Sequence, residues 1–273
     1  MIIGAHGCRK MNDKDYGFVV VHIPHASTYI PEEYLQDYLV PEVVLENEKR
    51  RMTDSFCDEL YDPVGFDNQV IATVSRLVCD VERFRHDADE PNARFGHGLM
   101  YTRTSYGRRL RENDAALRAR ILSEIYDIHH RRLDDAVDAA LSNFGFCLII
   151  DGHSFNSKKI VKFDNIFSLP DFDIGTDIYH TPEILTQMLY SKIESLGYTP
   201  RLNSPYAGAI TPLKYYRQNK RVVSIMIETN RKLYMNEKTM LKSENFMKIR
   251  EVCHSLMYAL ADTTLEYFRS IDG

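Results

Sequence analysis

Four short runs of apolar residues predict buried β-strands in this chain. Each run is rich in β-branched side chains and almost continuously hydrophobic, which is typical of strands covered on both faces of a sheet. The runs are Phe18–Ile23 (FVVVHI), Gln69–Val74 (QVIATV), Phe146–Asp151 (FCLIID) and Val222–Glu228 (VVSIMIE).

Longer stretches around these strands have helical patterns. One of them is closed by Gly197, because glycine readily adopts the left-handed conformation that ends helices. Since strands alternate with helices, the pattern predicts an α/β fold, a three-layer sandwich around a mixed, largely parallel central sheet. No Pro-, Gly- or Ser-rich linker divides the sequence, so we expect a single domain over residues 1–273. The helical stretches are Pro41–Tyr61, Gly107–Asn143, Pro182–Leu196 and Lys238–Phe268.

The composition is that of an ordinary globular protein. Of 273 residues, 44% are hydrophobic, which is enough for a sizeable core. A net charge of −5 argues against a nucleic-acid partner, because phosphate binding needs a basic surface. No apolar run approaches the roughly 18 residues of a membrane span. The N-terminal segment also lacks the apolar stretch of a secretory signal, so a cytoplasmic location is expected by elimination.

The cysteines form no CxxC pair and are odd in number, which indicates buried, reduced thiols in a reducing compartment. They are Cys8, Cys57, Cys79, Cys147 and Cys253.

Residues able to do chemistry follow three of the four predicted strands. In open α/β sheets, ligands bind at the carboxyl ends of the strands. The first strand runs into His25, the third into Asp151 and His153, and the fourth ends at Glu228. This coincidence is the main sign of a functional site.

Each of these residues has a functional and a structural interpretation. His25 and His153 are suited to bind zinc, with Asp151 orienting the second imidazole and Gly152 allowing a tight turn. The structural alternative for His25 is a loop histidine or a polar cap, and for His153 it is an ordinary polar residue where a strand passes into a loop. Glu228 closes an apolar strand, where it serves as a general base or forms an ion pair with Arg231 or another arginine.

Other polar residues are harder to assign from one sequence. Asp54 lies on or at the start of a predicted helix, where an N-cap or a solvated position is the commoner role. Glu48 and Asp58 are equally plausible carboxylate ligands by spacing. An arginine-rich stretch around Arg76 and Arg83 suggests an anion pocket, unless neighbouring acids neutralise it. The further arginines are Arg85, Arg94 and Arg103, and the acids are Asp80, Glu82 and Asp87.

Two histidine patterns imitate metal motifs. His180 and Glu183 have HxxE spacing, but Pro182 marks this segment as the start of a helix. His129 and His130 are helix neighbours, which point about 100° apart and so are poorly placed to bind one metal together.

Taken together and in order, seven motifs resemble the N-formylglutamate amidohydrolase family. They cover most of the chain, from about residue 18 to 240, and the ordered set is far more specific than any member. The motifs are PHAS (24–27), TDSFCDELY (53–61), SRLVCDVER (75–83), IHH (128–130), DGHSF (151–155), NSPYAG (203–208) and IETNRKLYM (227–235).

The resemblance implies a fold like that of zinc carboxypeptidases and aspartoacylases. It implies one Zn²⁺ per chain, bound by His25, Asp54 and His153, and it implies Glu228 as the catalytic carboxylate. The substrate it implies is a small anionic N-acyl amino acid, first of all N-formyl-L-glutamate from histidine degradation, which would give formate and glutamate. The candidate substrate-binding residues are Arg83, Arg76, His130, Asn203, Tyr206 and Arg231.

Two positions depart from the family pattern. Glu82 in VER stands where the family commonly has Asn before Arg, and Ala209 stands where a second glycine is expected. These departures leave open the same chemistry on another N-acyl amino acid or a small peptide. A non-catalytic anion-binding protein on this scaffold is a further alternative, against which the retained histidines and carboxylates argue.

Overall fold

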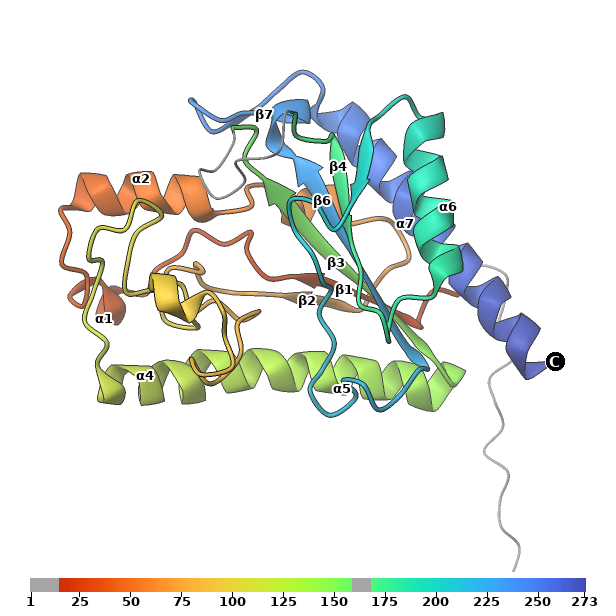
Figure 1. Cartoon of the computed structure of the whole chain (residues 1–273), viewed down its shortest axis with the longest axis horizontal. Coiled ribbons are helices and arrows are strands. Elements are labelled where there is room, and N and C mark those ends of the chain that lie inside the picture. Colours follow the sequence, from red (N-terminus) through yellow and green to blue (C-terminus); the bar gives the residue numbers. More distant parts are fainter. Residues whose placement is uncertain (1–14, 159–167) are drawn as a thin grey trace, which may run out of the picture.

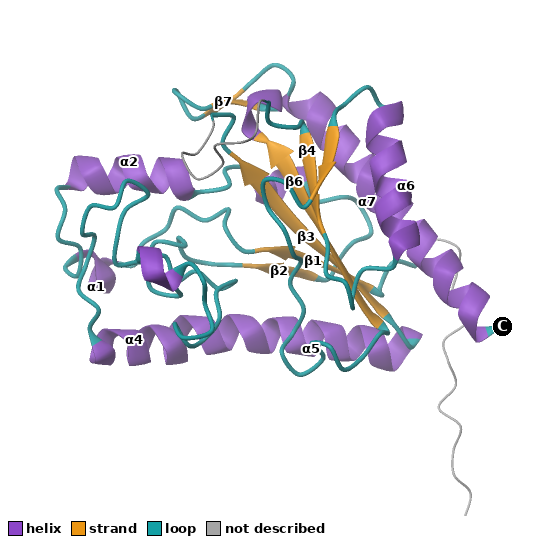
Figure 2. Cartoon of the chain, in the orientation of Figure 1, coloured by secondary structure: helices purple, strands orange, loops and turns teal. Residues whose placement is uncertain are grey.

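A computed structural model describes residues 15–158 and 168–273 of the chain. Within this part, the centre is a six-stranded sheet with the strand order β2-β1-β3-β6-β4-β5 (Figures 1 and 2). Its strands are β1 (Val19–Ile23), β2 (Gln69–Ile71), β3 (Cys147–Phe155), β4 (Phe172–Gly175), β5 (Pro200–Leu202) and β6 (Val222–Asn230), and a separate two-stranded hairpin is formed by β7 (Met235–Asn236) and β8 (Leu241–Lys242).

The sheet is mixed and largely parallel, as the sequence predicted. Strands β2, β1, β3 and β6 are parallel neighbours, whereas β4 pairs antiparallel with β6 and carries β5 beside it. The parallel strands bring their carboxyl ends to one edge of the sheet. The residues that follow β1, β3 and β6 therefore meet there.

Helices cover both faces of the sheet, which gives the three-layer arrangement. Figure 1 shows α5 on one side, with α6 and α7 on the other. The helices are α1 (Glu32–Leu35), α2 (Glu42–Met52), α3 (Cys57–Leu60), α4 (Ala115–Ile121), α5 (Asp127–Phe144), α6 (Glu183–Ser195) and α7 (Phe246–Asp272), with a π-helical turn at Leu122–Tyr126 and 3₁₀ turns at Ala93–Phe95 and Arg231–Leu233.

Several predicted element boundaries were wrong for identifiable reasons. The stretch Pro41–Tyr61 is two helices, because the chain leaves helical geometry at Thr53 and reaches a left-handed residue at Phe56. The helix predicted from Gly107 begins only at Ala115, because Asp114 caps it by accepting the backbone N–H of Leu117 at 2.7 Å. The C-terminal helix likewise starts at Phe246. Gly197, at φ 83°, follows α6 as predicted.

Strand β3 is longer than its apolar run, and this changes the role predicted for Gly152. The β3–β6 ladder continues through Gly152 and His153 to Phe155, so Gly152 lies in a strand and forms no tight turn. A Cβ atom there would come within 2.6 Å of the Tyr61 ring and 2.7 Å of Ile23. Glycine is therefore required by close packing.

The alternation of side chains along the strands sorts the core into layers. Val20, Ile149 and Val222 point to the face covered by α5, where they pack with apolar residues of that helix. Ile23 and Ile150 point to the opposite face, beneath α3, α6 and α7. His22, Asp151 and His153 continue the α5-facing positions toward the carboxyl edge. A further apolar cluster, built from α1, α2, α4 and the loops between Ala72 and Leu110, lies beside that edge.

In the described part of the chain, four cysteines are all buried and free, as predicted, and Cys8 lies outside it. None of the described helices combines the length and apolar character that crossing a membrane requires.

Candidate metal centre

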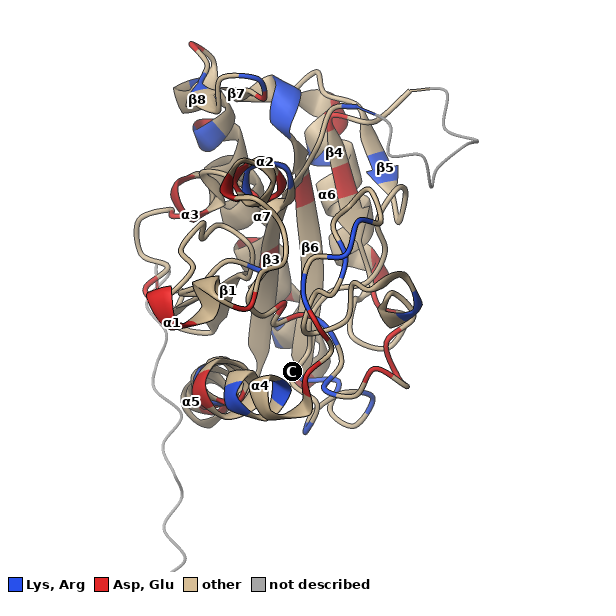
Figure 3. Cartoon of the chain, turned by 90° about the vertical axis from the view of Figure 1, so that its left-hand side faces the viewer, with Lys and Arg blue, Asp and Glu red and all other residues tan. Residues whose placement is uncertain are grey.

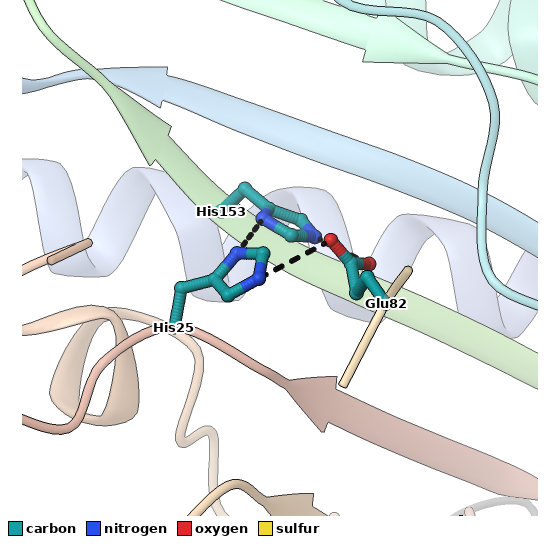
Figure 4. A group of neighbouring side chains, drawn as sticks. All are labelled: His25, Glu82 and His153. Carbon is teal, nitrogen blue, oxygen red and sulfur yellow. Dashed lines mark hydrogen bonds and ion pairs between the residues drawn. The ribbon is translucent and has the colours of Figure 1, made fainter. Parts of the chain in front are cut away.

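His25 and His153 converge at the carboxyl edge of the sheet. His25 follows β1 after Pro24, and His153 lies on the neighbouring strand β3. Their Nδ1 atoms are 3.3 Å apart, and both side chains are buried (Figure 4). Two residues separated by 128 positions in the sequence thus present two nitrogen ligands to one point.

Asp54 joins the two histidines from the non-helical segment between α2 and α3. Its backbone N–H donates to the His25 carbonyl at 2.9 Å, which ties this segment to the end of β1. Its Oδ2 atom lies 3.3 Å from Nδ1 of His153 and 3.7 Å from Nδ1 of His25. The three ligands implied by the family resemblance are therefore brought together.

The opposite nitrogen of each imidazole faces a buried carboxylate. Nε2 of His25 is 2.9 Å from Oδ1 of Asp80, and Nε2 of His153 is 3.1 Å from Oδ1 of Asp151. A carboxylate accepts the Nε2–H and leaves the Nδ1 lone pair free, which is how metal-binding histidines are commonly oriented. This arrangement favours a ligand position on the Nδ1 side.

Glu82 offers a second carboxylate to the same histidines. Its carboxylate oxygens lie 3.6 Å from Nε2 of His25 and 3.1 Å from Nε2 of His153, and its side chain is 19% exposed (Figure 4). With these two histidines it forms a group close enough to hold a metal ion. Two carboxylates, Asp54 and Glu82, thus compete for the role of third ligand.

The donor set fits zinc on the Nδ1 side. Ligand atoms about 2.1 Å from a tetrahedral zinc ion lie roughly 3.4 Å from one another. The three separations among Nδ1 of His25, Nδ1 of His153 and Oδ2 of Asp54 are 3.3, 3.3 and 3.7 Å. Two imidazoles and a carboxylate are also a usual catalytic zinc set, with a fourth position left open.

The negative charge of the acids around His25 and His153 favours the binding of a cation. Burial alone would lower the pKa of His153, but Glu82, Asp151 and Asp54 raise it well above its ordinary value. Without a metal ion, a proton on His153 balances these acids, and a bound metal would take over this role.

Asp54 and Asp80 are kept ionised by arginines and histidines. Burial alone would raise the pKa of Asp54, but hydrogen bonds from His153 and His25 and the charge of Arg231 hold it well below its ordinary range. Burial of Asp80 is likewise outweighed by Arg76 and His25, and its pKa is low.

Glu228 lies beside His153 on the neighbouring strand β6. The two residues are register partners, so their side chains share the α5-facing side of the sheet. Glu228 is 6% exposed, and its Oε2 has no hydrogen-bond partner among the described residues. Burial raises the pKa of Glu228 to about 8, with further contributions from nearby acids. An ion pair with Arg231, the structural alternative, is not formed, because Arg231 binds Asp54.

The predicted anion pocket is a buried network centred on Asp80. Arg76 donates to Oδ2 of Asp80 through Nε and Nη2, at 3.2 and 2.7 Å, and Tyr101 donates its hydroxyl at 2.7 Å. Arg83 approaches Asp80 at 3.3 Å and Glu90 at 3.8 Å, with a quarter of its side chain exposed. The arginines are thus paired with a neighbouring acid, which was the alternative to an anion pocket, but the pairing at Asp80 is buried and not on the surface.

Arg231 is fully engaged by the protein. It donates to Oδ1 of Asp54 at 2.8 Å, to Ser154 Oγ at 3.1 Å and to the Arg51 carbonyl at 2.8 Å. These contacts hold Oδ1 of Asp54, so that Oδ2, which also accepts the backbone N–H of Ser154 at 3.2 Å, faces the histidines. They also occupy the guanidinium that the family resemblance assigned to a substrate carboxylate.

Three other residues that were predicted to bind the substrate have different surroundings in the structure. The ring of Tyr206 lies 6.0 Å from that of Phe155 at the end of β3, and burial and then the charge of Glu228 raise the pKa of its hydroxyl. The Nε2 atom of His130 is 2.8 Å from the Val81 carbonyl, next to Glu82. The amide of Asn203 binds the backbone and side chain of Thr176, so it organises the loop after β4.

The remaining candidates have structural contacts. Glu48 accepts hydrogen bonds from Ser105, and Asp58 is exposed on α3. His180 is buried at the start of α6, where it bonds the backbone of Val222 and Arg217. The HxxE spacing is therefore unrelated to the metal-binding group.

Sequence reasoning missed His22 and Asp173, and it dismissed His129. His22 is within hydrogen-bond distance of Asp151 and His129, while Asp173 is the register partner of Glu228 on β4. Figure 3 shows acidic positions, in red, on the neighbouring strands β4 and β6. The alternation of side chains along the first predicted strand could have indicated His22. It lies two residues after Val20, so it shares the same buried face of the strand and is buried beside the site.

The sequence of this chain is similar to those of known proteins. Residues 18–235 match the family described as N-formylglutamate amidohydrolase. An N-formylglutamate deformylase of Pseudomonas putida is 28% identical over 229 residues, covering 80% of this chain and 82% of the relative. A deformylase of the same name from Pseudomonas aeruginosa is 28% identical over 205 residues, covering 71% and 75%.

Solved structures show the same fold. The crystal structure of an N-formylglutamate amidohydrolase from Ralstonia eutropha JMP134 superposes with a TM-score of 0.80 at 23% identity, covering 91% of this chain and 94% of that one. A gene product from Agrobacterium tumefaciens has a TM-score of 0.67 at 19% identity, covering 90% and 92%. The family match spans well over half of the sequence. The chain therefore belongs to the N-formylglutamate amidohydrolase family of amide hydrolases.

Proposed function

We propose that this chain is a zinc-dependent hydrolase that cleaves N-formyl-L-glutamate to formate and L-glutamate. One observation carries the proposal: Nδ1 of His25, Nδ1 of His153 and Oδ2 of Asp54 converge within 3.7 Å, while the two Nε2 atoms face buried carboxylates. The substrate is suggested by the names of the two Pseudomonas relatives.

Each residue of the proposed zinc site has a defined part. His25, His153 and Asp54 would hold a single zinc ion, which when bound polarises the amide carbonyl and acidifies the attacking water. Asp80 and Asp151 orient the two imidazoles through their Nε2–H groups. Arg231 holds Asp54 in place, and we assign it this role instead of substrate binding.

Glu228 is the proposed proton carrier. Its unpartnered Oε2 accepts a proton from the attacking water as the oxygen bonds to the formyl carbon. When the C–N bond breaks, Glu228 returns that proton to the leaving nitrogen, so that the amine departs neutral. In the metal-free chain burial raises the pKa of Glu228 to about 8, and the charge of a bound zinc ion would favour the carboxylate form that accepts the proton.

Arginines near the metal-binding group are the proposed contacts for the substrate carboxylates. Arg83 is the stronger candidate, because its partly exposed guanidinium has only longer contacts of 3.3 and 3.8 Å. Arg76 is already paired with Asp80 and contributes mainly charge. Tyr206 and His130 remain proposed pocket residues beside Glu228 and Glu82, and Asn203 acts through the loop that it holds.

Metal analysis combined with a formate assay tests this proposal. Wild-type protein should contain about one zinc per chain, and His25→Ala and His153→Ala should each lose both zinc and formate release. His180→Ala is a matched control, since it removes a buried histidine whose side-chain hydrogen bonds are with backbone groups. Full zinc occupancy in both His25→Ala and His153→Ala would refute the site.

A further inference from the structure

We propose that His22 and His129 form, with Asp151, a buried hydrogen-bonded relay that sets the tautomer and orientation of the His153 imidazole. The inference rests on the proposed function, because it treats His153 as a metal ligand. It assigns a positioning role to two histidines that neither bind the metal nor reach the substrate.

The relay is continuous from α5 to the metal-binding group. Nε2 of His129 lies 2.9 Å from Nε2 of His22, and Nδ1 of His22 lies 2.8 Å from Oδ1 of Asp151. The same Oδ1 atom is 3.1 Å from Nε2 of His153. All four side chains are at most 4% exposed, so water does not replace these contacts.

When His22 and His129 are both neutral, only one arrangement of protons gives every hydrogen bond of the relay one donor and one acceptor. An ionised Asp151 can only accept, so His22 must donate from Nδ1 and keep a lone pair on Nε2. His129 must then donate from Nε2. Burial lowers the pKa of His129 to about 2, which keeps this imidazole neutral with a single N–H.

This arrangement of protons determines the tautomer of His153. Nε2 of His153 faces Oδ1 of Asp151 and Oε1 of Glu82, each at 3.1 Å, so its N–H lies on the side of these acids and the lone pair lies on Nδ1, the atom that faces Asp54 and His25. The second oxygen of Asp151 is held by the backbone N–H of Ile210 at 3.1 Å. Asp151 therefore cannot rotate freely, and the relay fixes the oxygen that His153 uses.

The helix is built so that His129 reaches the sheet. The buried positions Ile121 and Tyr126 are five residues apart, across the π-helical turn, whereas buried positions from His129 onward follow three- and four-residue spacing. This wide turn shifts the buried face of the helix. The apolar residues before it pack in the cluster around α1 and α2, those after it pack on the sheet, and His129 contacts His22 of β1.

Zinc affinity measured by competition with a chromophoric chelator tests the relay. His129→Leu keeps the volume but removes the donor, and it should weaken zinc binding roughly tenfold or more, the usual effect of disturbing such outer contacts. His129→Gln places an amide N–H near the lost Nε2–H and should bind zinc almost as well as wild type. The control His180→Leu removes a buried histidine away from the relay and should lower the melting temperature without weakening zinc.

A double variant separates the relay from general destabilisation. If His129 acts through His22 in a single relay, the double variant His22→Leu/His129→Leu should reduce zinc affinity little more than His22→Leu alone. Additive losses, or unchanged affinity in His129→Leu, would overturn the relay. So would a second zinc equivalent in wild type that is lost in His22→Leu, because His22, Glu82 and Asp151 would then be ligands themselves.

The result also distinguishes the relay from the proposed function. If His153→Ala loses zinc while His129→Leu binds it normally, the relay is wrong and the proposed metal centre stands. If His153→Ala binds zinc normally, the metal centre fails and the relay fails with it.

Discussion

Glu228 lies directly opposite Asp173 on the antiparallel pair of strands β6 and β4. Both acids are buried, and His153 is the register partner of Glu228 on the other side. Asp173 accepts backbone N–H groups from Ser204 and Tyr206 at 2.9 and 2.7 Å, whereas one oxygen of Glu228 has no partner in the described structure. Of the two acids, Glu228 is thus the one free to exchange a proton.

This environment predicts a pH-dependent stability difference in the metal-free protein. The pKa of Glu228 in the folded chain, about 8, exceeds its ordinary value of 4.5, mainly because of burial. Between these pH values the folded protein keeps a proton that the unfolded chain releases, so the stability contributed by Glu228 falls as the pH rises. Glu228→Gln should therefore melt higher than wild type by a margin that is larger at pH 8.5 than at pH 5.

Melting curves of metal-free wild type and Glu228→Gln, recorded in pairs at each pH, measure this difference. The contributions of the other titrating groups to the melting temperature are largely the same in both proteins and cancel. Glu33→Gln, at an exposed position of α1, should show the same margin at both pH values. A margin for Glu228→Gln that does not change with pH would mean that Glu228 is ionised throughout.

The choice between the two competing carboxylates can be tested with matched amides. Asp54 approaches the Nδ1 side of the histidines and Glu82 the Nε2 side. Because Asp80 and Asp151 already face the Nε2 atoms, Asp54→Asn should lose zinc while Glu82→Gln should keep about one per chain. Elemental analysis of variants shown by circular dichroism to be folded measures this, and the reverse pattern would make Glu82 the ligand.

Arg83 should contribute to selectivity for a dicarboxylic substrate. Arg83→Lys replaces a two-pronged donor by a point charge, so kcat/KM for N-formylglutamate should fall roughly tenfold, about 1.5 kcal/mol for one charge-assisted hydrogen bond. The loss should be smaller for N-formylglutamine, which has one carboxylate fewer. Arg85→Lys is the control, because Arg85 pairs with Asp127 on the surface. Equal losses on both substrates would make Arg83 a structural partner of Asp80.

The central strands were predictable because each is buried on both faces. β1, β3 and β6 are the apolar runs of the sequence, although β3 and β6 extend further than those runs. β2 ends at Ile71, short of the predicted Val74. The neighbouring strands β4 and β5 were missed, since each has only three or four residues and gains its order from pairing, which a local pattern does not record.

The site was predictable where it follows strand ends and unpredictable where it depends on pairing across the chain. His25, His153 and Glu228 were visible as polar residues after apolar runs. Asp54 lies between two short helices, and only the family resemblance pointed to it. The contact of His129 with His22 spans 107 residues, so its helical neighbours gave no indication of it.

Formate release by Glu228→Gln tests the central claim most directly, since this variant keeps the size of the side chain but cannot accept the proton. The zinc-loaded variant should contain about one zinc per chain, yet hydrolyse N-formyl-L-glutamate roughly 10²- to 10⁴-fold more slowly than wild type. Wild type stripped of zinc should be equally inactive and should recover when zinc is restored. Near-normal turnover by Glu228→Gln, or full activity of the stripped wild type, would contradict the account.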